Sequence, residues 1–557
     1  ATLDDHLAAV LRRQGFTGMM EASLESRLGR RLDPRLADLG RLLWFDTITG
    51  LNDDNTCGGC HSPTAGFGDT QSIAIGIDNN GFVGPHRLGP RNQRRSPIVI
   101  NAVFYPNLMW NSRFASLSGD PFDNRQGFSF PNPEGLSLSY LPQLLVAQAF
   151  IPPTERNEVA GFTFPGDNFA IRAEVLRRLN ATPAYRRLFG EVFAEVRAGA
   201  PITFDLFGKA IAEFEFTLAF TDAPIDRFAR GDRTSMSAEQ KRGALLFFGE
   251  AGCVSCHAVS GTSHEMFSDF QQHVIGIPQI VPAVTNAVFD GKDSNEDFGL
   301  EQITGDKKDR YRFRTSPLRN VAVQPTFFHN GAFTDLERAV RHHLDVFSSA
   351  RSFTTDELDE DLRGPLGPLE PVLKRVDPLL AEPIPLMSEQ VAELVAFVRE
   401  SLLDPRARPE NLMKLIPDRV PSGRTVPTFE VPEAAEALAG GPSGTALRKG
   451  FGDARGRVAG ESNQGLLELS AGEHHRQARQ VTWQLELSRP SRVEASVFDV
   501  TGRRVRRLAA DLSLGSGSHR LVWDTREDAG REAPGGVYFL SVRAGNASAA
   551  RRVVVAR

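Results

Sequence analysis

The sequence predicts a multidomain protein in which two mainly α-helical lobes precede a small all-β sandwich. One short motif, Cys-x-x-Cys-His, begins at Cys57 and again at Cys253, 196 residues later, and this duplication predicts two similar lobes. Helical periodicity predominates up to about residue 420, and a two-residue alternation of apolar and polar side chains follows after about residue 465. With 557 residues, of which 41% are hydrophobic, the chain is long enough for more than one core. We expect domains at 1–165, 166–420 and 466–557, with a linker at 421–465.

Composition excludes several classes of protein. The formal net charge of -5 and the pI of about 6.2 give no indication of a nucleic-acid partner. No run of eighteen apolar residues occurs, so we expect no membrane span. The first five residues, Ala-Thr-Leu-Asp-Asp, are already polar, and we interpret the chain as a mature form left after removal of a signal peptide.

The two Cys-x-x-Cys-His motifs contain all four cysteines of the chain. This spacing is typical of c-type haem attachment, in which both sulfurs bond the haem and the adjacent His binds its iron. Two zinc ribbons, two redox pairs or one zinc site pooling the four cysteines are alternatives, but they leave the His after each pair unexplained. Because covalent haem is attached outside the bacterial cytoplasm, we expect a periplasmic, secreted or cell-surface protein. The expected attachment residues are Cys57, Cys60 and His61 for the first haem, and Cys253, Cys256 and His257 for the second.

Helical periodicity and capping signals define the helices of the two lobes. Thr334 and Ser388 are candidate N-caps, and a Glu three residues after Thr334 completes a capping box. The segment 237–248 leads directly into the second motif. The expected helices span residues 35–43, 171–179, 204–220, 237–248, 334–347 and 388–402.

The residue composition of the sequence changes after residue 420. Glycine-rich and proline-rich segments up to Gly465 are typical of a linker. In the following region Val493, Ala495 and Val497 alternate with polar residues, and a Gly-Ser-Gly turn follows at 515–517. We therefore expect a small β-sandwich of about ninety residues.

The strand-rich region also carries a resemblance. The segments 497–505, 523–524 and 535–539 resemble the immunoglobulin-like modules that end many secreted bacterial proteins. Some of those modules are sorting signals for an outer-membrane export system. A passive adhesion or spacer domain is the equally weighted alternative.

Residues 35 to 402 resemble the bacterial diheme cytochrome c peroxidase family, which includes the methylamine dehydrogenase maturation enzyme. The resemblance implies two cytochrome c-like haem lobes, with a peroxidatic haem in the N-terminal lobe and an electron-transfer haem in the C-terminal lobe. The strings that carry it are Leu39–Asp46, Gly89–Asn92, Asn101–Phe104, Pro224–Phe228, Arg242–Phe248, Ser316–Val321 and Phe328–Gly331.

The family has a Gln and a Glu ten residues apart in the peroxide pocket of the first haem. Gln148 and Glu158 keep that spacing here, with Pro152 packing between them. A peroxidase needs such a group to take a proton from hydrogen peroxide and return it to the leaving oxygen. Glu134 is the alternative to Glu158, because residues 115–142 look like an insertion that shifts the register.

Two further residues gain a role from the resemblance. Trp110 corresponds to the family's Trp between the haems, which relays electrons, although a core Trp is compatible with the same position. His86 is the only His in the loop where many members carry a displaceable ligand of the first iron, and its offset differs by two residues. The first iron is therefore either bound by His86 or open on one side.

The second iron is expected to have two protein ligands. Many members use a Met at the position of His343, and the maturation enzyme uses a Tyr. His343 shares a helix face with Leu336 and Val340, whereas His342 is turned about 100° away. We expect His257 and His343 to bind the iron together, which lowers its potential relative to Met ligation. Two surface histidines are the alternative.

The family also binds Ca²⁺ between the lobes. Asn92 resembles its side-chain ligand, and the backbone at Gln324 and Thr326 resembles its carbonyl ligands. Such hard oxygen ligands are the ones that Ca²⁺ prefers.

Together these features predict a diheme peroxidase. It would reduce hydrogen peroxide to water with electrons from a small donor protein, a cytochrome c or a cupredoxin, relayed from the second haem through Trp110 to the first. One alternative is a diheme oxidase that oxidises residues of a partner protein through high-valent iron. The other is a non-enzymatic electron-transfer cytochrome in which both irons are closed. Family members are often dimers, so a homodimer is an expected assembly.

Overall fold

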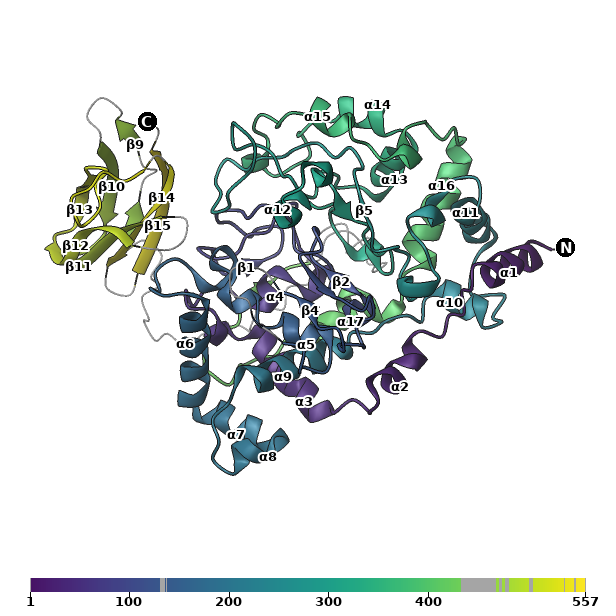
Figure 1. Ribbon diagram of the computed structural model, residues 1–557, viewed down its shortest axis with the longest axis horizontal. Coiled ribbons are helices and arrows are strands. Elements are labelled where there is room, and N and C mark those ends of the chain that lie inside the picture. Colours follow the sequence, from purple (N-terminus) through teal and green to yellow (C-terminus); the bar gives the residue numbers. More distant parts are fainter. Residues whose placement is uncertain are drawn as a thin grey trace, which may run out of the picture.

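A computed structural model describes residues 2–130, 136, 138–431, 467–469, 473–475, 480–499, 504–534, 536–544 and 547–555. These residues form a helical body with an all-β module beside it (Figure 1). The N-terminal helix α1 (Leu3–Arg13) and the β module lie at opposite ends of the molecule in this view. Most of the expected linker, residues 432–465, lies outside the described residues. Among the described helices, none combines the length and the apolar character that crossing a membrane requires.

Helix α3 (Pro34–Phe45) leads into the first haem motif and packs against α9 (Phe204–Phe216). Asp33 starts α3 by accepting a hydrogen bond from the backbone N–H of Arg35, and proline occupies the first helical position. The two helices cross at Gly40, where an added Cβ would lie 1.9 Å from the carbonyl oxygen of Ala210. Only glycine allows this approach, which brings both helices to the first motif.

The same arrangement occurs at the second motif. Helix α11 (Ala238–Phe248) leads into it and packs against α16 (Ser388–Ala396). A Cβ at Gly243 would lie 1.9 Å from the carbonyl oxygen of Glu393. The same helix packing therefore occurs in both lobes: a helix leads into each haem motif and crosses a second helix at a glycine.

The buried apolar side chains of the body form two main clusters. The first takes most of its residues from 24–220 and 403–429, and the second from 7–16 and 225–402. Helix α6 (Asn168–Ala181) and helix α9 both belong to the first cluster. The expected boundary at residue 165 therefore does not coincide with the change of cluster, which falls near residue 222.

Helices occur in the segments where periodicity predicted them, but two expected caps are wrong. Asp335, not Thr334, caps α13 (Leu336–Leu344), because its carboxylate accepts from the N–H of Arg338. Ser388 is the first residue of α16, and its N-cap is Met387. The expected helix at 334–347 is also divided, since α14 (Val346–Arg351) begins after a second capping aspartate.

Shorter elements complete the body. One two-stranded parallel pair joins the return segment near residue 428 to the first lobe. The remaining helices are α2 (Leu24–Leu28), α4 (Cys57–Cys60), α5 (Leu144–Gln148), α7 (Pro183–Val192), α8 (Ala194–Arg197), α10 (Pro224–Ala229), α12 (Glu301–Thr304), α15 (Glu370–Leu373) and α17 (Pro409–Leu412). The strands are β1 (Phe82–Val83), β2 (Asn107–Leu108), β3 (Phe114–Ser116), β4 (Phe128–Ser129), β5 (Gln272–His273), β6 (Phe313–Arg314) and β7 (Thr428–Phe429).

The all-β module consists of two antiparallel sheets. In one, β10 (Gln480–Leu487) pairs with β8 (Leu467–Leu469), β9 (Glu473–His475) and β13 (Gly517–Trp523). In the other the order is β12 (Arg504–Leu514), β11 (Ser491–Asp499), β14 (Gly536–Ala544) and β15 (Ala547–Val555). Trp483 and Trp523 are fully buried in the shared core, and the alternating side chains of β11 point into it as expected. The all-β prediction for this region is confirmed.

The module touches the helical body through an aromatic contact. Phe539 on β14 stacks on Phe162, with 4.7 Å between the ring centroids, and both pack with Ile77. The module therefore lies against the loops that follow the first haem motif.

Candidate haem sites and acid–base pocket

Two cavities lie at the ends of the helices that carry the motifs. The first, of about 550 Å³, is lined by Cys57, Cys60 and His61. The second, of about 360 Å³, is lined by the corresponding residues of the second motif. Both volumes lie within the range of about 300–1,000 Å³ that is common for cofactor pockets. The first cavity thus carries two sulfurs and one imidazole at its wall, and the second carries two sulfurs and four imidazoles, those of His257, His273, His329 and His343.

Each motif histidine is oriented by a backbone carbonyl. The Nδ1 of His61 lies 2.9 Å from the carbonyl oxygen of Pro97, and the Nδ1 of His257 lies 2.9 Å from that of Phe267. A hydrogen bond from Nδ1–H to a carbonyl fixes the tautomer in which Nε2 is free to bind a metal. Both rings are therefore arranged to bind an iron through Nε2.

The cysteines fit haem attachment better than zinc. The first pair and the second pair line different cavities, which contradicts a single zinc site that pools all four. Two sulfurs beside one imidazole, repeated in two cavities, match the donors of a c-type haem.

His343 lies in the second cavity and faces His257. The centroids of the two rings are 6.1 Å apart, and Nδ1 of His343 lies 2.8 Å from the carbonyl oxygen of Ala339. This spacing leaves room for one metal ion bound by a nitrogen of each ring at about 2 Å. His342 is fully buried, with its nitrogens bonded to Ser349 and to the backbone of Ile275. Neither residue is the surface histidine of the alternative interpretation.

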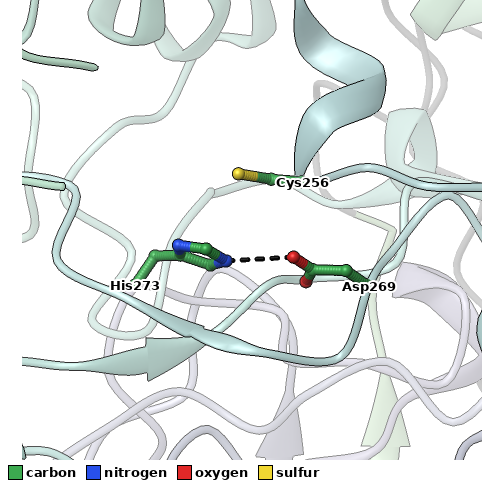
Figure 2. A group of neighbouring side chains, drawn as sticks. All are labelled: Cys256, Asp269 and His273. Carbon is green, nitrogen blue, oxygen red and sulfur yellow. Dashed lines mark hydrogen bonds and ion pairs between the residues drawn. The ribbon is translucent and has the colours of Figure 1, made fainter. Parts of the chain in front are cut away.

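A charged triad lies at the edge of the second cavity. Figure 2 shows Cys256 beside His273, whose Nε2 lies 3.0 Å from the carboxylate of Asp269. The other ring nitrogen lies 2.7 Å from the carboxylate of Asp377. The hydrogen bond to Asp269 is the main cause that raises the pKa of His273, followed by contacts with the Cys256 sulfur and with Asp377. Because haem attachment occupies the sulfur of Cys256, we interpret this group as an imidazolium between two carboxylates and not as a metal site. Asp269 lies four residues before His273, but Asp377 is 104 residues away, and sequence reasoning did not identify this pair of partners.

The expected acid–base residues converge on the first cavity. Gln148 ends helix α5, Pro152 begins a 3₁₀ turn, and Glu158 lies in a π-helical turn, Arg156–Ala160. All three line the cavity that contains His61. Isolated π-helical turns are frequent at functional sites because they redirect a side chain out of the helical register. Glu134, the alternative to Glu158, lies outside the described residues.

The turn that carries Glu158 is fixed to the haem-binding loop. Asn55 donates from its amide to the carbonyl oxygen of Glu158, at 2.7 Å, and also contacts the sulfur of Cys60, at 3.3 Å. A Cβ at Gly76 would lie 2.1 Å from the carbonyl oxygen of Asn157 and 2.8 Å from the Cα of Glu158. The backbone at Glu158 therefore rests directly on the loop that follows the first motif.

The surroundings of Glu158 adjust its acidity. Burial is the main cause that raises its pKa, to about 7, and the neighbouring carboxylate of Glu155 raises it further, whereas Arg113 lowers it. Arg113 and Glu155 form an ion pair at 2.8 Å, and both line the cavity. A carboxyl group with a pKa near neutrality can both accept and return a proton. Sequence reasoning missed this ion pair, because the two residues are 42 positions apart.

Trp110 forms part of the wall between the cavities. It lines both of them, is 8% exposed, and donates from Nε1 to the carbonyl oxygen of Arg95 at 2.8 Å. A place in the wall of both cavities is what we expect of a Trp that lies between the two haems.

His86 does not reach the first cavity. Its side chain is 74% exposed, and its Nδ1 lies 3.0 Å from the carboxylate of Glu430. The residues that line the cavity include no histidine other than His61 within the described part of the chain. The interpretation of His86 as a ligand of the first iron is therefore wrong in this structure, and the alternative of an open iron is favoured.

The expected calcium ligands do not form a calcium site. The guanidinium of Arg95 donates to the backbone carbonyl of Thr326 and, at 2.8 Å, to the side-chain oxygen of Gln324. Asn92 lines the first cavity, and its Oδ1 is buried without a hydrogen-bond partner in the described region. The guanidinium of Arg95 already binds the carbonyl oxygen of Thr326, one of the expected ligands, and Asn92 lines the first cavity whereas Gln324 and Thr326 line the second, so these residues do not assemble the expected calcium site.

Comparisons with known proteins identify similar proteins for part of this chain. A family model described as di-haem cytochrome c peroxidase matches residues 34–234. The methylamine utilization protein MauG of Methylorubrum extorquens is 29% identical over 313 residues, which cover 56% of this chain and 69% of that protein. The cytochrome c551 peroxidase of Pseudomonas aeruginosa is 27% identical over 312 residues, covering 56% and 72%. The crystal structure of a MauG-like protein associated with microbial copper homeostasis aligns with a TM-score of 0.48 at 22% identity, over 68% of this chain and 91% of that one.

The family model and the curated relatives support a kinship with diheme cytochrome c peroxidases and MauG. Such a family implies two haem c groups, in agreement with the two cavities. The names of the relatives are consistent with a peroxidase-type oxidoreductase.

Proposed function

We propose that this chain, related over its helical body to the diheme cytochrome c peroxidases and MauG, reduces hydrogen peroxide to water with electrons from a small donor protein. The observation that carries the proposal is an asymmetry between the two cavities. The second is lined by four histidines, of which His257 and His343 face each other. In the described residues the first contains a single histidine, His61, together with Gln148 and Glu158. One cavity is suited to electron transfer and the other to peroxide.

The first cavity holds the groups that peroxide cleavage needs. A haem held there by Cys57, Cys60 and His61 would supply electrons to a peroxide oxygen. The Glu158 carboxylate accepts the proton from that oxygen and delivers it to the other oxygen, which leaves as water. The reaction balances as one peroxide, two protons and two electrons giving two waters. A pKa near 7 allows Glu158 to act in both directions at neutral pH.

Gln148 and the Arg113–Glu155 ion pair support this proton transfer. The Gln148 amide can hydrogen-bond a peroxide oxygen without competing for the proton, because an amide does not titrate in this range. Arg113 stabilises the ionised form of Glu158, and Glu155 opposes it. The balance of these two charges keeps the pKa of Glu158 close to the pH at which the enzyme would act.

Electrons are proposed to cross from the second cavity to the first through Trp110. The indole belongs to the wall of both cavities, and its hydrogen bond to the backbone at Arg95 fixes its orientation. His257 and His343 would together hold the second haem, which would supply electron transfer there rather than oxygen chemistry. The donor would be a small cytochrome c or a cupredoxin that docks near the second cavity.

We also propose a periplasmic or secreted location. Covalent haem attachment by two motifs supports it. The C-terminal module, with its two antiparallel sheets, would be an immunoglobulin-like sorting signal or a spacer domain. A homodimer remains the expected assembly.

The test uses the full-length holoprotein, hydrogen peroxide and a reduced small cytochrome c. The proposal predicts that two equivalents of cytochrome are oxidised for each peroxide, and that Glu158→Gln loses most of this turnover. Oxidation of residues on an added partner protein, without turnover of the donor, would indicate the oxidase alternative instead. Reduction of both haems by the donor with no consumption of peroxide would indicate an electron carrier.

A further inference from the structure

We propose that the guanidinium of Arg95 is a built-in cation that joins the two haem lobes and makes a calcium ion between them unnecessary. The proposal concerns the assembly of the lobes and does not depend on the reaction that the first haem performs.

Arg95 lies at the interface between the two lobes. Its Nη1 donates to the carbonyl oxygen of Thr326, and its Nη2 donates to the side-chain oxygen of Gln324 at 2.8 Å and to the carbonyl oxygen of Asp69 at 3.2 Å. One oxygen thus comes from the loop after the first motif and two come from the segment 324–326. A planar guanidinium with five N–H donors can bind several such oxygens at once.

The oxygens around Arg95 are of the kind that a calcium ion would use. Two are backbone carbonyls and one is an amide oxygen, all neutral, which Ca²⁺ binds readily. Here they accept hydrogen bonds from a cation that is part of the chain. Gln324 also donates to the carbonyl of Ala65, and Thr326 donates to that of Gln71, so both are held from the opposite lobe.

Charge compensation supports the same interpretation. Arg95 is almost completely buried, and burial of a charge is costly unless a counter-charge and hydrogen bonds compensate for it. Both Nη atoms of Arg95 donate hydrogen bonds, whereas its Nε has no partner among the described residues. Asp69, also buried, supplies the counter-charge, with its carboxylate fixed by the N–H groups of Gln71 and Ser96. Burial lowers the pKa of Arg95 to about 10, which leaves the guanidinium protonated at neutral pH.

The backbone of Arg95 makes hydrogen bonds to residues that line the haem cavities. Its N–H donates to the carbonyl of His329 at 2.8 Å, and its carbonyl accepts from Trp110. Arg95 also lines both cavities. A cation at this position therefore fixes the wall through which the cavities communicate, a function that a dissociable ion would serve only while bound.

The wild-type holoprotein gives the first test. After passage over a chelating resin, elemental analysis is expected to find far less than one calcium per chain. The thermal midpoint is expected to be the same in excess EGTA and in excess Ca²⁺. One calcium per chain, or a midpoint that falls in EGTA, would overturn the proposal.

A pair of matched variants gives the second test. Arg95→Gln removes the cation and is expected to lower the midpoint by roughly 5 °C, and added Ca²⁺ is expected to restore part of the loss. Arg94→Gln is the control, because the neighbouring Arg94 loses an ion pair with Asp297 that lies away from these oxygens. Its midpoint should fall without any response to Ca²⁺.

Two results with the variants would refute the proposal. In one, Arg95→Gln is as stable as the wild type, or is destabilised with no response to Ca²⁺, so that Arg95 is an ordinary packing residue. In the other, Ca²⁺ stabilises both variants equally, so that the effect is nonspecific. If Arg95→Gln does not accumulate, the calcium content of the wild type still decides the question.

Discussion

Glu158 gives the most specific prediction about the reaction, because its acidity links the structure to a pH profile. With a pKa of about 7 the carboxyl group is ionised in about 1% of molecules at pH 5 and in half of them at pH 7. If the carboxylate accepts the proton of peroxide, the rate should rise roughly fifty-fold between these two pH values. Steady-state peroxide consumption with reduced donor in excess measures this rise directly.

Glu158→Gln should remove both the catalysis and the pH dependence. Loss of a general acid–base group typically lowers the rate by about 10²–10⁴-fold. The same substitution should increase the free energy of unfolding, although it lowers the rate. Because the pKa of Glu158 is raised in the folded state, stability falls as the pH rises from the ordinary value of 4.5 to about 7, and a neutral Gln avoids this loss. Above pH 7 the variant should therefore be more stable than the wild type and much less active.

Glu155→Gln is the matched control. This substitution removes the like charge that raises the pKa of Glu158, and it frees Arg113 to stabilise the ionised form of Glu158. The pH at which the rate of peroxide consumption reaches half of its maximum should therefore move to a lower value. The assignment of Glu158 would be refuted if the Glu158→Gln variant kept the wild-type turnover, or if its rate still rose with a midpoint near pH 7.

Three other predictions concern the remaining parts of the site. His343→Ala should convert the second haem from low-spin to high-spin in the absorption and paramagnetic resonance spectra, whereas the matched His86→Ala should leave both haems unchanged; an altered first haem in His86→Ala would contradict the geometry. Trp110→Phe should slow electron transfer between the haems in stopped-flow measurements and leave reduction of the second haem by the donor unchanged; equal rates would exclude Trp110 from the path. Gly76→Ala should displace the backbone at Glu158 and lower kcat by about 10²-fold without loss of attached haem, and an unchanged kcat would contradict the close contact.

The parts of the site that depend on local sequence could be predicted. The spacing of Cys57, Cys60 and His61 fixes their relative positions within one turn, so the attachment site follows from the motif itself. His343 was also predictable, because helical periodicity sets its face relative to Leu336 and Val340. The lining of the second cavity includes His343, in agreement with that reasoning.

The errors arose where distant segments determine the structure. His86 belongs to a loop whose side chain pairs with Glu430, 344 residues later, and nothing near His86 indicates that partner. The calcium prediction failed for the same reason. The oxygens around Arg95 come from residues 69, 324 and 326, and only the folded chain brings them together. Local competition explains the misplaced cap at α13. Asp335 accepts the N–H of Arg338, whereas a cap at Thr334 would have bound the N–H of Glu337, so the helix begins one residue later than expected.

The central claim is that the first iron is open beside an acid–base group and the second is closed by two histidines. An electron paramagnetic resonance spectrum of the fully oxidised holoprotein, repeated after half-reduction, tests it most directly. We predict one high-spin ferric signal from the first haem and one low-spin ferric signal from the second before any reduction. Two low-spin signals that persist after half-reduction would mean that both irons are closed, and would contradict the account.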